Sequence, residues 1–347
     1  MLRQFKPRYR SFLGVDLGST SIKIVEISGP SSNYCIEGYG YDQLPFNALE
    51  TSREIVVSSI KKILVRIKAS TKIAAIAVPD SIVITKAIQL ADSLTDLEIE
   101  ELIFLEADKL LAYPPNKINV DYVVLGPSKI SFGMIDVLIL ASREDNIHAR
   151  VELLKDAGLD TRVVDMESYA IASFYEYSEK DSSKLLAVFD IAYDSLRLFI
   201  LENKKIIYTR EDTFDCQKLF ISIAKHYKVT IEEARFLFNQ KLKPLDYGSE
   251  FLNPFLKLTA VEITRSLNYF FSMADNNFID RIILSGEIVG LWNLPTFVRQ
   301  ETGVQTYFAN PFSRLPLSKS LDSSKAKNYS SIYLLALGLA LRLANDH

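Results

Sequence analysis

Short apolar runs alternate along this chain with longer stretches in which apolar residues recur at helical spacing. Runs rich in Val, Ile and aromatic residues predict β-strands, and a recurrence every three to four residues predicts helices. The predicted strands are 11–18, 21–28, 35–41, 73–78, 82–89, 121–125, 134–141, 161–165 and 278–284. The predicted helices are 50–68, 94–111, 145–157, 167–177, 251–273 and 330–341. This alternation is typical of an α/β protein.

The stretch 178–184, SEKDSSK, divides the chain near its middle, and the pattern starts again after it. It carries charge and serine but no apolar residue, which is typical of a surface linker. The segment 15–24, VDLGSTSIKI, aligns with 189–198, FDIAYDSLRL, at an offset of 174 residues (190 − 16). Aspartate, serine, a basic residue and the apolar positions match in class. The sequence therefore predicts an internal duplication, with two unrelated hairpins as the alternative.

The amino-acid composition excludes several classes of protein. Of the 347 residues, 48% are hydrophobic and 24% are charged, which excludes a disordered chain and a simple coiled coil. The formal charge of −3 gives no electrostatic case for nucleic acid as a partner. Two distant cysteines and three dispersed histidines exclude a disulfide framework and predict no zinc site.

The two ends of the chain predict neither a signal peptide nor a membrane span. Residues 1–10 are basic, but the apolar run after them stops at Asp16, too early for a signal sequence. The apolar stretch 330–341 is too short to cross a bilayer, which takes about 20 residues. We expect a soluble, cytoplasmic protein with a solvated basic tail, contact of that tail with anionic lipid being the alternative.

Both duplicated turns have the chemistry of a phosphate site. Tight turns rich in small polar residues present successive backbone N–H groups to an anion. The first turn carries Gly18, Ser19, Thr20 and Ser21, and Lys23 adds a positive charge. The aspartates before the turns, Asp16 and Asp190, are natural ligands for Mg²⁺, directly or through water. The second turn carries Ala192, Tyr193, Asp194 and Ser195.

A third element fits a nucleotide held between the two halves. The strand 278–284 ends in Ser285-Gly286-Glu287, and a ligand commonly sits at such a strand end in α/β folds. The preceding helix carries Glu262 and Arg265 one turn apart. They are expected either to flank a base and ribose or to form a surface ion pair.

These motifs, in this order, resemble those of the actin-like ATPase superfamily, and most closely the PilM family of type IV pilus assembly proteins. The segments that carry the resemblance are 13–28, LGVDLGSTSIKIVEIS, 138–167, LILASREDNIHARVELLKDAGLDTRVVDME, and 262–271, EITRSLNYFF. The resemblance implies two duplicated actin-like (ribonuclease-H-like) domains with an FtsA-like inserted subdomain. The implied parts are the tail 1–10, a first domain of 11–79 and 160–178, an insert of 80–159, and a second domain of 185–345.

The resemblance also implies a function. PilM-like proteins bind ATP or ADP with Mg²⁺ between the halves, at the cytoplasmic face of the bacterial inner membrane, in a machine that drives twitching motility. They hold the N-terminal cytoplasmic peptide of the membrane protein PilN, with the pilus motor ATPases as further partners. By correspondence of motifs, the resemblance implies that the two turns bind phosphate and that Gly286 and Glu287 lie at the adenosine motif. Glu167 falls where relatives place an acidic residue that orients water, and 336–340 matches a small-residue helix that crosses another between the domains.

Two departures weaken the implied nucleotide site. Ala192 and Tyr193 stand where relatives have glycine and a small residue, and only one glycine precedes Glu287. Alanine does not readily adopt a positive φ, and a tyrosine beside phosphate is bulky. Asp194 is expected to repel phosphate unless it points to magnesium or solvent. We therefore expect weakened nucleotide binding and at most a weak ATPase.

The sequence is also compatible with other functions. A small-molecule kinase would use Asp165 or Glu167 as its base. An FtsA-like filament former on the membrane and a scaffold with an inactive nucleotide site are further alternatives. In a scaffold, the PilN-type peptide is expected to pair with a sheet edge or to lie in a groove walled by 73–89 and 94–111.

Overall fold

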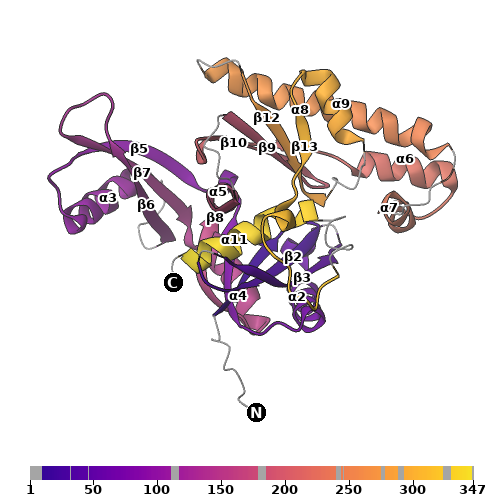
Figure 1. Ribbon diagram of the computed structural model, residues 1–347, viewed down its shortest axis with the longest axis horizontal. Coiled ribbons are helices and arrows are strands. Elements are labelled where there is room, and N and C mark those ends of the chain that lie inside the picture. The colour runs from indigo at the N-terminus through magenta and orange to yellow at the C-terminus, as the bar shows by residue number, and fades with distance from the viewer. Residues whose placement is uncertain are drawn as a thin grey trace, which may run out of the picture.

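The computed structural model describes residues 10–31, 33–45, 47–110, 117–178, 185–239, 244, 246–274, 278–287, 293–322 and 330–345, without the side chains of 106–110 and 239. Two five-stranded sheets repeat one topology (Figure 1). The first, in the order β3-β2-β1-β4-β8, comprises β1 (Ser11–Leu17), β2 (Ser21–Ser28), β3 (Cys35–Gln43), β4 (Ile73–Val78) and β8 (Asp160–Met166). The second, in the order β11-β10-β9-β12-β13, comprises β9 (Leu185–Ile191), β10 (Ser195–Glu202), β11 (Lys205–Thr213), β12 (Arg281–Ser285) and β13 (Thr306–Phe308).

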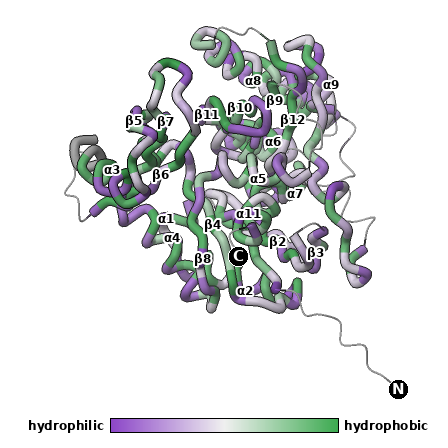
Figure 2. The backbone as a smooth tube through the Cα atoms, turned by 60° about the vertical axis from the view of Figure 1, so that its left-hand side comes forward, coloured by the Kyte–Doolittle hydropathy of each residue, from purple (hydrophilic) through white to green (hydrophobic). Residues whose placement is uncertain are grey.

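Strand directions repeat as well. In each sheet an antiparallel three-strand meander is extended by two parallel strands. The apolar stretches follow the strands of both sheets, as the green tube in Figure 2 shows. The predicted α/β class with a duplicated domain is therefore confirmed.

A third sheet projects to the left in Figure 1, in the order β5-β7-β6. It contains β5 (Ile84–Ala91), β6 (Ile118–Pro127) and β7 (Met134–Arg143), and it follows the short helix η1 (Asp80–Ile82). The helix α3 (Asp96–Leu110) covers it, packing Ile99 and Ile103 against Val137 and Ile139. This sheet has a small core of its own.

The first sheet is covered by α2 (Arg53–Ile67) after the short α1 (Ala48–Thr51), and by α4 (Glu144–Asp156). Although α4 falls within the range expected for the insert, its Leu153 and Leu154 pack in the core of the first sheet with Ile60. The second sheet is covered by α6 (Gln217–Tyr227), α7 (Ile231–Asn239), η3 (Gly248–Leu252), α8 (Asn253–Met273) and α9 (Leu294–Thr302). Each sheet therefore has its own outer core.

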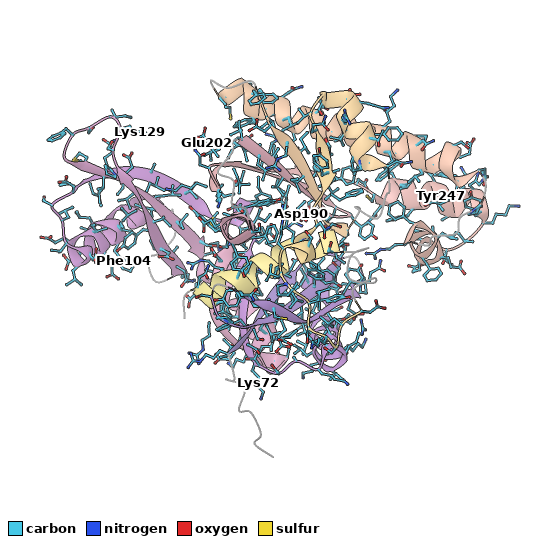
Figure 3. The ribbon with its side chains drawn as sticks, in the orientation of Figure 1. Lys72, Phe104, Lys129, Asp190, Glu202 and Tyr247 are labelled. Carbon is cyan, nitrogen blue, oxygen red and sulfur yellow. The ribbon has the colours of Figure 1, made fainter. Side chains whose placement is uncertain are left out.

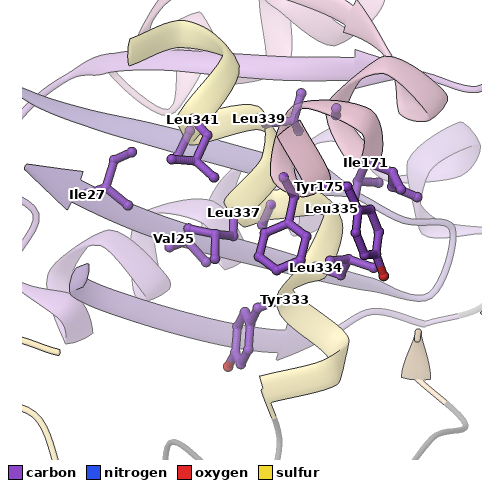
Figure 4. Packing of buried hydrophobic residues seen from close by; sticks show 14 of the residues in the cluster. Val25, Ile27, Ile171, Tyr175, Tyr333, Leu334, Leu335, Leu337, Leu339 and Leu341 are labelled. Carbon is purple, nitrogen blue, oxygen red and sulfur yellow. The ribbon is translucent and has the colours of Figure 1, made fainter. Parts of the chain in front are cut away.

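Two helices share a further core between the sheets (Figure 4). They are α5 (Glu167–Ser178) and α11 (Leu334–Asn345), which follows the short helices η5 (Pro311–Ser313) and η6 (Ser330–Tyr333). A Cβ added at Gly338 would overlap the backbone carbonyl oxygen of Ala170, so the two helices touch at their backbones. Within the described ranges, no helix combines the length and apolar character needed to cross a membrane.

Candidate functional site

The two hairpin turns have the same backbone geometry. The Gly18 N–H donates to the Ser21 carbonyl oxygen at 3.0 Å, and the Ala192 N–H donates to the Ser195 carbonyl oxygen at 2.9 Å. These two hydrogen bonds are related by the offset of 174 residues that the sequence repeat predicted. The turns therefore adopt one conformation despite the change from glycine to alanine, and Ala192 is not in the left-handed region.

Each hairpin also holds an ion pair across its two strands. Asp16 stands opposite Lys23 in the β1–β2 register, with the Lys23 Nζ 3.2 Å from Oδ2 of Asp16. Asp190 stands opposite Arg197 in the β9–β10 register, with Nη2 of Arg197 3.1 Å from Oδ2 of Asp190. Burial raises the pKa of Asp16 above its ordinary value, although the Lys23 charge opposes this. The two predicted magnesium ligands are thus each paired with a fixed cation. Asp190 is labelled at the junction of the two halves in Figure 3.

The carboxylate of Glu287 lies inside the first turn. Its Oε2 accepts a hydrogen bond from Oγ1 of Thr20 at 2.8 Å, and its Oε1 accepts one from Oγ of Ser21. The Lys23 Nζ is 3.1 Å from the same Oε1. Burial alone would raise the pKa of Glu287, but the Lys23 charge and these hydrogen bonds lower it below its ordinary value. The hydroxyl groups expected to bind phosphate therefore already bind an anion.

The chain reaches this position through Gly286. This residue has a φ of +96°, and a Cβ there would overlap the backbone of Ile191. Only glycine fits such a conformation and such a close approach. Gly286 therefore directs the Glu287 side chain from the end of β12 across to the first turn.

A second carboxylate crosses between the halves in the opposite direction. Glu167, the first residue of α5, accepts hydrogen bonds from Nη1 of Arg197 at 2.6 Å to each of its oxygens. Burial would lower the pKa of Arg197, but Glu167 and Asp190 hold it well above its ordinary value. The expected water-orienting acid is therefore neutralised by a charged arginine.

Arg235 of α7 adds a third contact between the halves. Its Nη1 donates to the carbonyl oxygen of Leu44 at 3.2 Å, and its guanidinium lies 4.6 Å from the ring centre of Tyr193. The Tyr193 ring itself is buried between Phe220 and Phe238. The ring therefore packs in the core of the second half, and its effect on a bound phosphate stays a prediction.

The remaining predicted residues are peripheral to this network. Ser19 is half-buried, Asp194 is exposed, and Ser195 is half-buried in the second turn. Glu262 and Arg265 form an ion pair with each other on α8, and the Arg265 charge acts on Asp212 of β11. The ion-pair alternative thus describes their geometry, and a role at a base or ribose stays a prediction.

Asp80 belongs to the site, although none of the sequence motifs includes it. It follows β4, and its Oδ2 accepts a hydrogen bond from the Ser168 N–H at 3.1 Å. Burial raises its pKa to about 7. Among the described residues, Oδ1 of Asp80, Oγ of Ser168 and Nε of Arg197 are buried without a hydrogen-bond partner, so a water molecule could satisfy them. The feature of the sequence that could have indicated Asp80 is its position just after a parallel strand. Glu167 and Glu287 each follow a parallel strand in the same way.

The donor set at the first turn suits a phosphate group. Hydroxyl groups and a lysine bind phosphate oxygens in the way that they bind the Glu287 carboxylate here. The site offers fewer free ligands to magnesium, because Lys23 and Arg197 already neutralise Asp16 and Asp190. No group of three or more His, Cys, Asp or Glu residues in the described part of the chain could hold a metal ion.

Comparison with known proteins gives the family. The model of the family described as "Type IV pilus assembly protein PilM" matches residues 14–344. The chain belongs to the PilM family. One solved structure, a "PilM-PilN type IV pilus biogenesis complex", has a TM-score of 0.78 at 22% identity, covering 97% of this chain and 99% of that chain. The ethanolamine utilization protein EutJ from Carboxydothermus hydrogenoformans has a TM-score of 0.60 at 14% identity, covering 98% and 92%. These likenesses confirm the expected actin-like fold, and the PilM family membership indicates a role in type IV pilus assembly.

Proposed function

We propose that this protein is a scaffold of the type IV pilus assembly platform that binds the N-terminal cytoplasmic tail of a PilN-type membrane protein. The observation that carries this proposal is the PilM family match over residues 14–344. The likeness to the PilM-PilN complex extends over 97% of the chain, and so includes both halves and the third sheet. The scaffold would be peripheral at the inner face of the inner membrane, held there through its partner, with pilus motor ATPases as further contacts.

The edge strand β5 is the proposed place for the tail. It lies at one end of the β5-β7-β6 order, so its outer edge carries backbone groups that an extended peptide can pair with. Ile84 on this strand is an apolar residue that is 45% exposed. Its side chain would contact a residue of the added strand.

ATP or ADP with Mg²⁺ is the proposed ligand between the halves. Ser19, Thr20, Ser21 and Lys23 would hold its phosphates, and Asp16 with Asp190 would face the metal. The nucleotide would supply negative charge that ties the first turn to the second half. Since Glu287 now makes that tie, we expect nucleotide to modulate the scaffold rather than to be consumed.

Each proposed base for a kinase or an ATPase is held in an ion pair with an arginine. Glu167 is paired with Arg197 at 2.6 Å, and Asp165 is paired with Arg342 at 3.1 Å. A general base must be unprotonated and open to the group that it deprotonates. The ion pairs therefore favour the scaffold over the small-molecule kinase.

Calorimetric titration of the full chain with the PilN-type N-terminal peptide tests the scaffold function. We expect saturable binding that is weakened at least about tenfold by Ile84→Asp, since the added charge would lie against the incoming strand. Leu258→Asp, on an apolar position of α8 that is 56% exposed, is the matched control and should bind as the wild type does. Absence of peptide binding to the wild-type chain would contradict the proposal.

A further inference from the structure

The first turn is occupied by a side chain of the same protein, and that occupant comes from the opposite half. We infer that Glu287 is a built-in anion for the phosphate loop, which ties the two halves together without nucleotide and must leave before a phosphate group can enter. The inference rests on the proposed nucleotide site and specifies how that site is regulated.

Hydrogen-bond donors converge on the Glu287 carboxylate. Three groups of the first turn, from Thr20, Ser21 and Lys23, meet on the two oxygens of one carboxylate. The Glu287 side chain is only 2% exposed. A charged group is that deeply buried only when its charge and its lone pairs are satisfied, and here both are. The Glu287 carboxylate is therefore a bound ligand of the loop and not a side chain that merely passes close to it.

The Glu287 carboxylate and a phosphate group exclude each other from the first turn. A carboxylate and a phosphate oxygen are both acceptor groups with negative charge, so they compete for the same hydroxyl and ammonium donors. If both were present, like charges would face each other in a buried site, where repulsion is far stronger than in water. Phosphate and Glu287 consequently bind the loop in exchange.

Because of the backbone contacts of its neighbours, Glu287 cannot leave the first turn without a structural change in the second half. Gly286 is packed against the backbone of Ile191, and Ser285 Oγ donates to Oδ1 of Asp190 at 3.0 Å. Moving Glu287 out of the loop would therefore disturb the ends of β12 and β9 together. This couples the occupancy of the first turn to the geometry of the second turn.

The reciprocal tie between Glu167 and Arg197 has the same form. In both, a carboxylate placed just after a strand end of one half is held by the basic residue of the hairpin in the other half. Lys23 and Arg197 occupy corresponding positions in the duplicated hairpins, at the same offset of 174 residues (197 − 23). Two carboxylate ties of this form therefore join the halves, and of these two only the Glu287 tie occupies the phosphate loop.

Nucleotide affinity in a Glu287→Ala variant tests the exchange. Full-length wild type, Glu287→Ala and Glu301→Ala are titrated with Mg-ATP and with pyrophosphate by calorimetry. Glu301→Ala removes the same charge from an exposed position of α9. If Glu287 fills the loop for nine-tenths of the time or more, its removal tightens apparent binding at least about tenfold. Glu301→Ala should match the wild type.

Hydrogen exchange of the ligand-free proteins gives a second readout. Glu287→Ala should speed exchange of the Gly18 amide at least severalfold, because its turn loses three contacts, and Glu301→Ala should not. Glu287→Gln keeps the shape, so it covers the case in which the alanine variant does not fold, and it should also tighten binding. Equal phosphate affinity in wild type and both Glu287 variants overturns the inference and leaves the nucleotide site standing. If no variant binds phosphate, both the inference and the proposed nucleotide site are overturned. PilN-type peptide binding reports separately on the scaffold function.

Discussion

Glu167 and Arg197 form a buried ion pair between the two halves, with Nη1 of Arg197 2.6 Å from both oxygens of Glu167. The same guanidinium also reaches Asp190 at 3.1 Å. One arginine of β10 therefore neutralises one acid from each half. Because the ion pair is buried, removing either partner would leave the other charge buried without compensation.

We predict that Arg197→Met destabilises the protein by about 3–5 kcal/mol, because it leaves the buried Glu167 and the half-buried Asp190 without their cation. Arg162→Met is the matched control, since Arg162 pairs with Asp160 at the surface and its side chain is 56% exposed. Such a surface pair contributes about 0–1 kcal/mol. Urea unfolding followed by circular dichroism measures both changes, and a similar small effect for the two variants would contradict the prediction.

The stability should depend on pH through Asp80. Its pKa in the folded protein is about 7, against an ordinary value of 3.8, because the group is buried and the Glu167 charge lies nearby, although the Ser168 hydrogen bonds and the Arg197 charge oppose this rise. Between these values the folded state binds more protons than the unfolded state, so this group's contribution to stability falls as pH rises from about 4 to 7. After allowance for its partial exposure, the loss is on the order of 2 kcal/mol.

Asp80→Asn tests this dependence because it removes the titrating group and keeps an acceptor for the Ser168 N–H. The variant should gain stability relative to the wild type at pH 8, and this gain should shrink toward pH 5. Comparing the two proteins at each pH cancels the titration of the histidines. A constant difference across the range would show that Asp80 does not titrate there.

The repeat was predictable from the sequence because its residues are neighbours along the chain. Asp16 and Lys23 lie on one hairpin, and so do Asp190 and Arg197, so residue spacing alone predicts that each pair can meet. Glu287 is different, because 264 residues separate it from Lys23 and only the packing of the two halves brings them together. No local pattern predicts such a contact.

Other parts of the fold depend on partners that periodicity does not identify. The apolar face of α4 is visible in the sequence, but not that Leu153 and Leu154 pack on the first sheet. In the same way, the Tyr193 side chain lies in an aromatic core formed by α6 and α7, two helices that the sequence analysis did not predict. Its position in the second turn could be predicted, whereas the direction of its ring could not.

We predict that Gly338→Ala destabilises the protein by about 3 kcal/mol, since the new Cβ would overlap the carbonyl oxygen of Ala170. Alanine is otherwise the better helix former by about 1 kcal/mol, so the sign itself is informative. Gly248→Ala is the control, because nothing lies within 4 Å of a Cβ there. Thermal unfolding should show a clear drop for Gly338→Ala and little change for Gly248→Ala. Equal melting temperatures would mean that α11 can move away from α5.

Finally, we predict that hydrolysis of ATP is slow and insensitive to both acids once proposed as bases. Asp165 and Glu167 are each held by an arginine, Arg342 and Arg197, so neither is free to activate water. A working general base contributes about 10²–10⁴-fold to a rate. In protein that remains folded, as checked by circular dichroism, Glu167→Gln and Asp165→Asn should therefore change phosphate release by less than about twofold, as should the exposed control Glu176→Gln. A fall of about a hundredfold in either variant would show that the ion pair opens during turnover and that the protein is an enzyme after all.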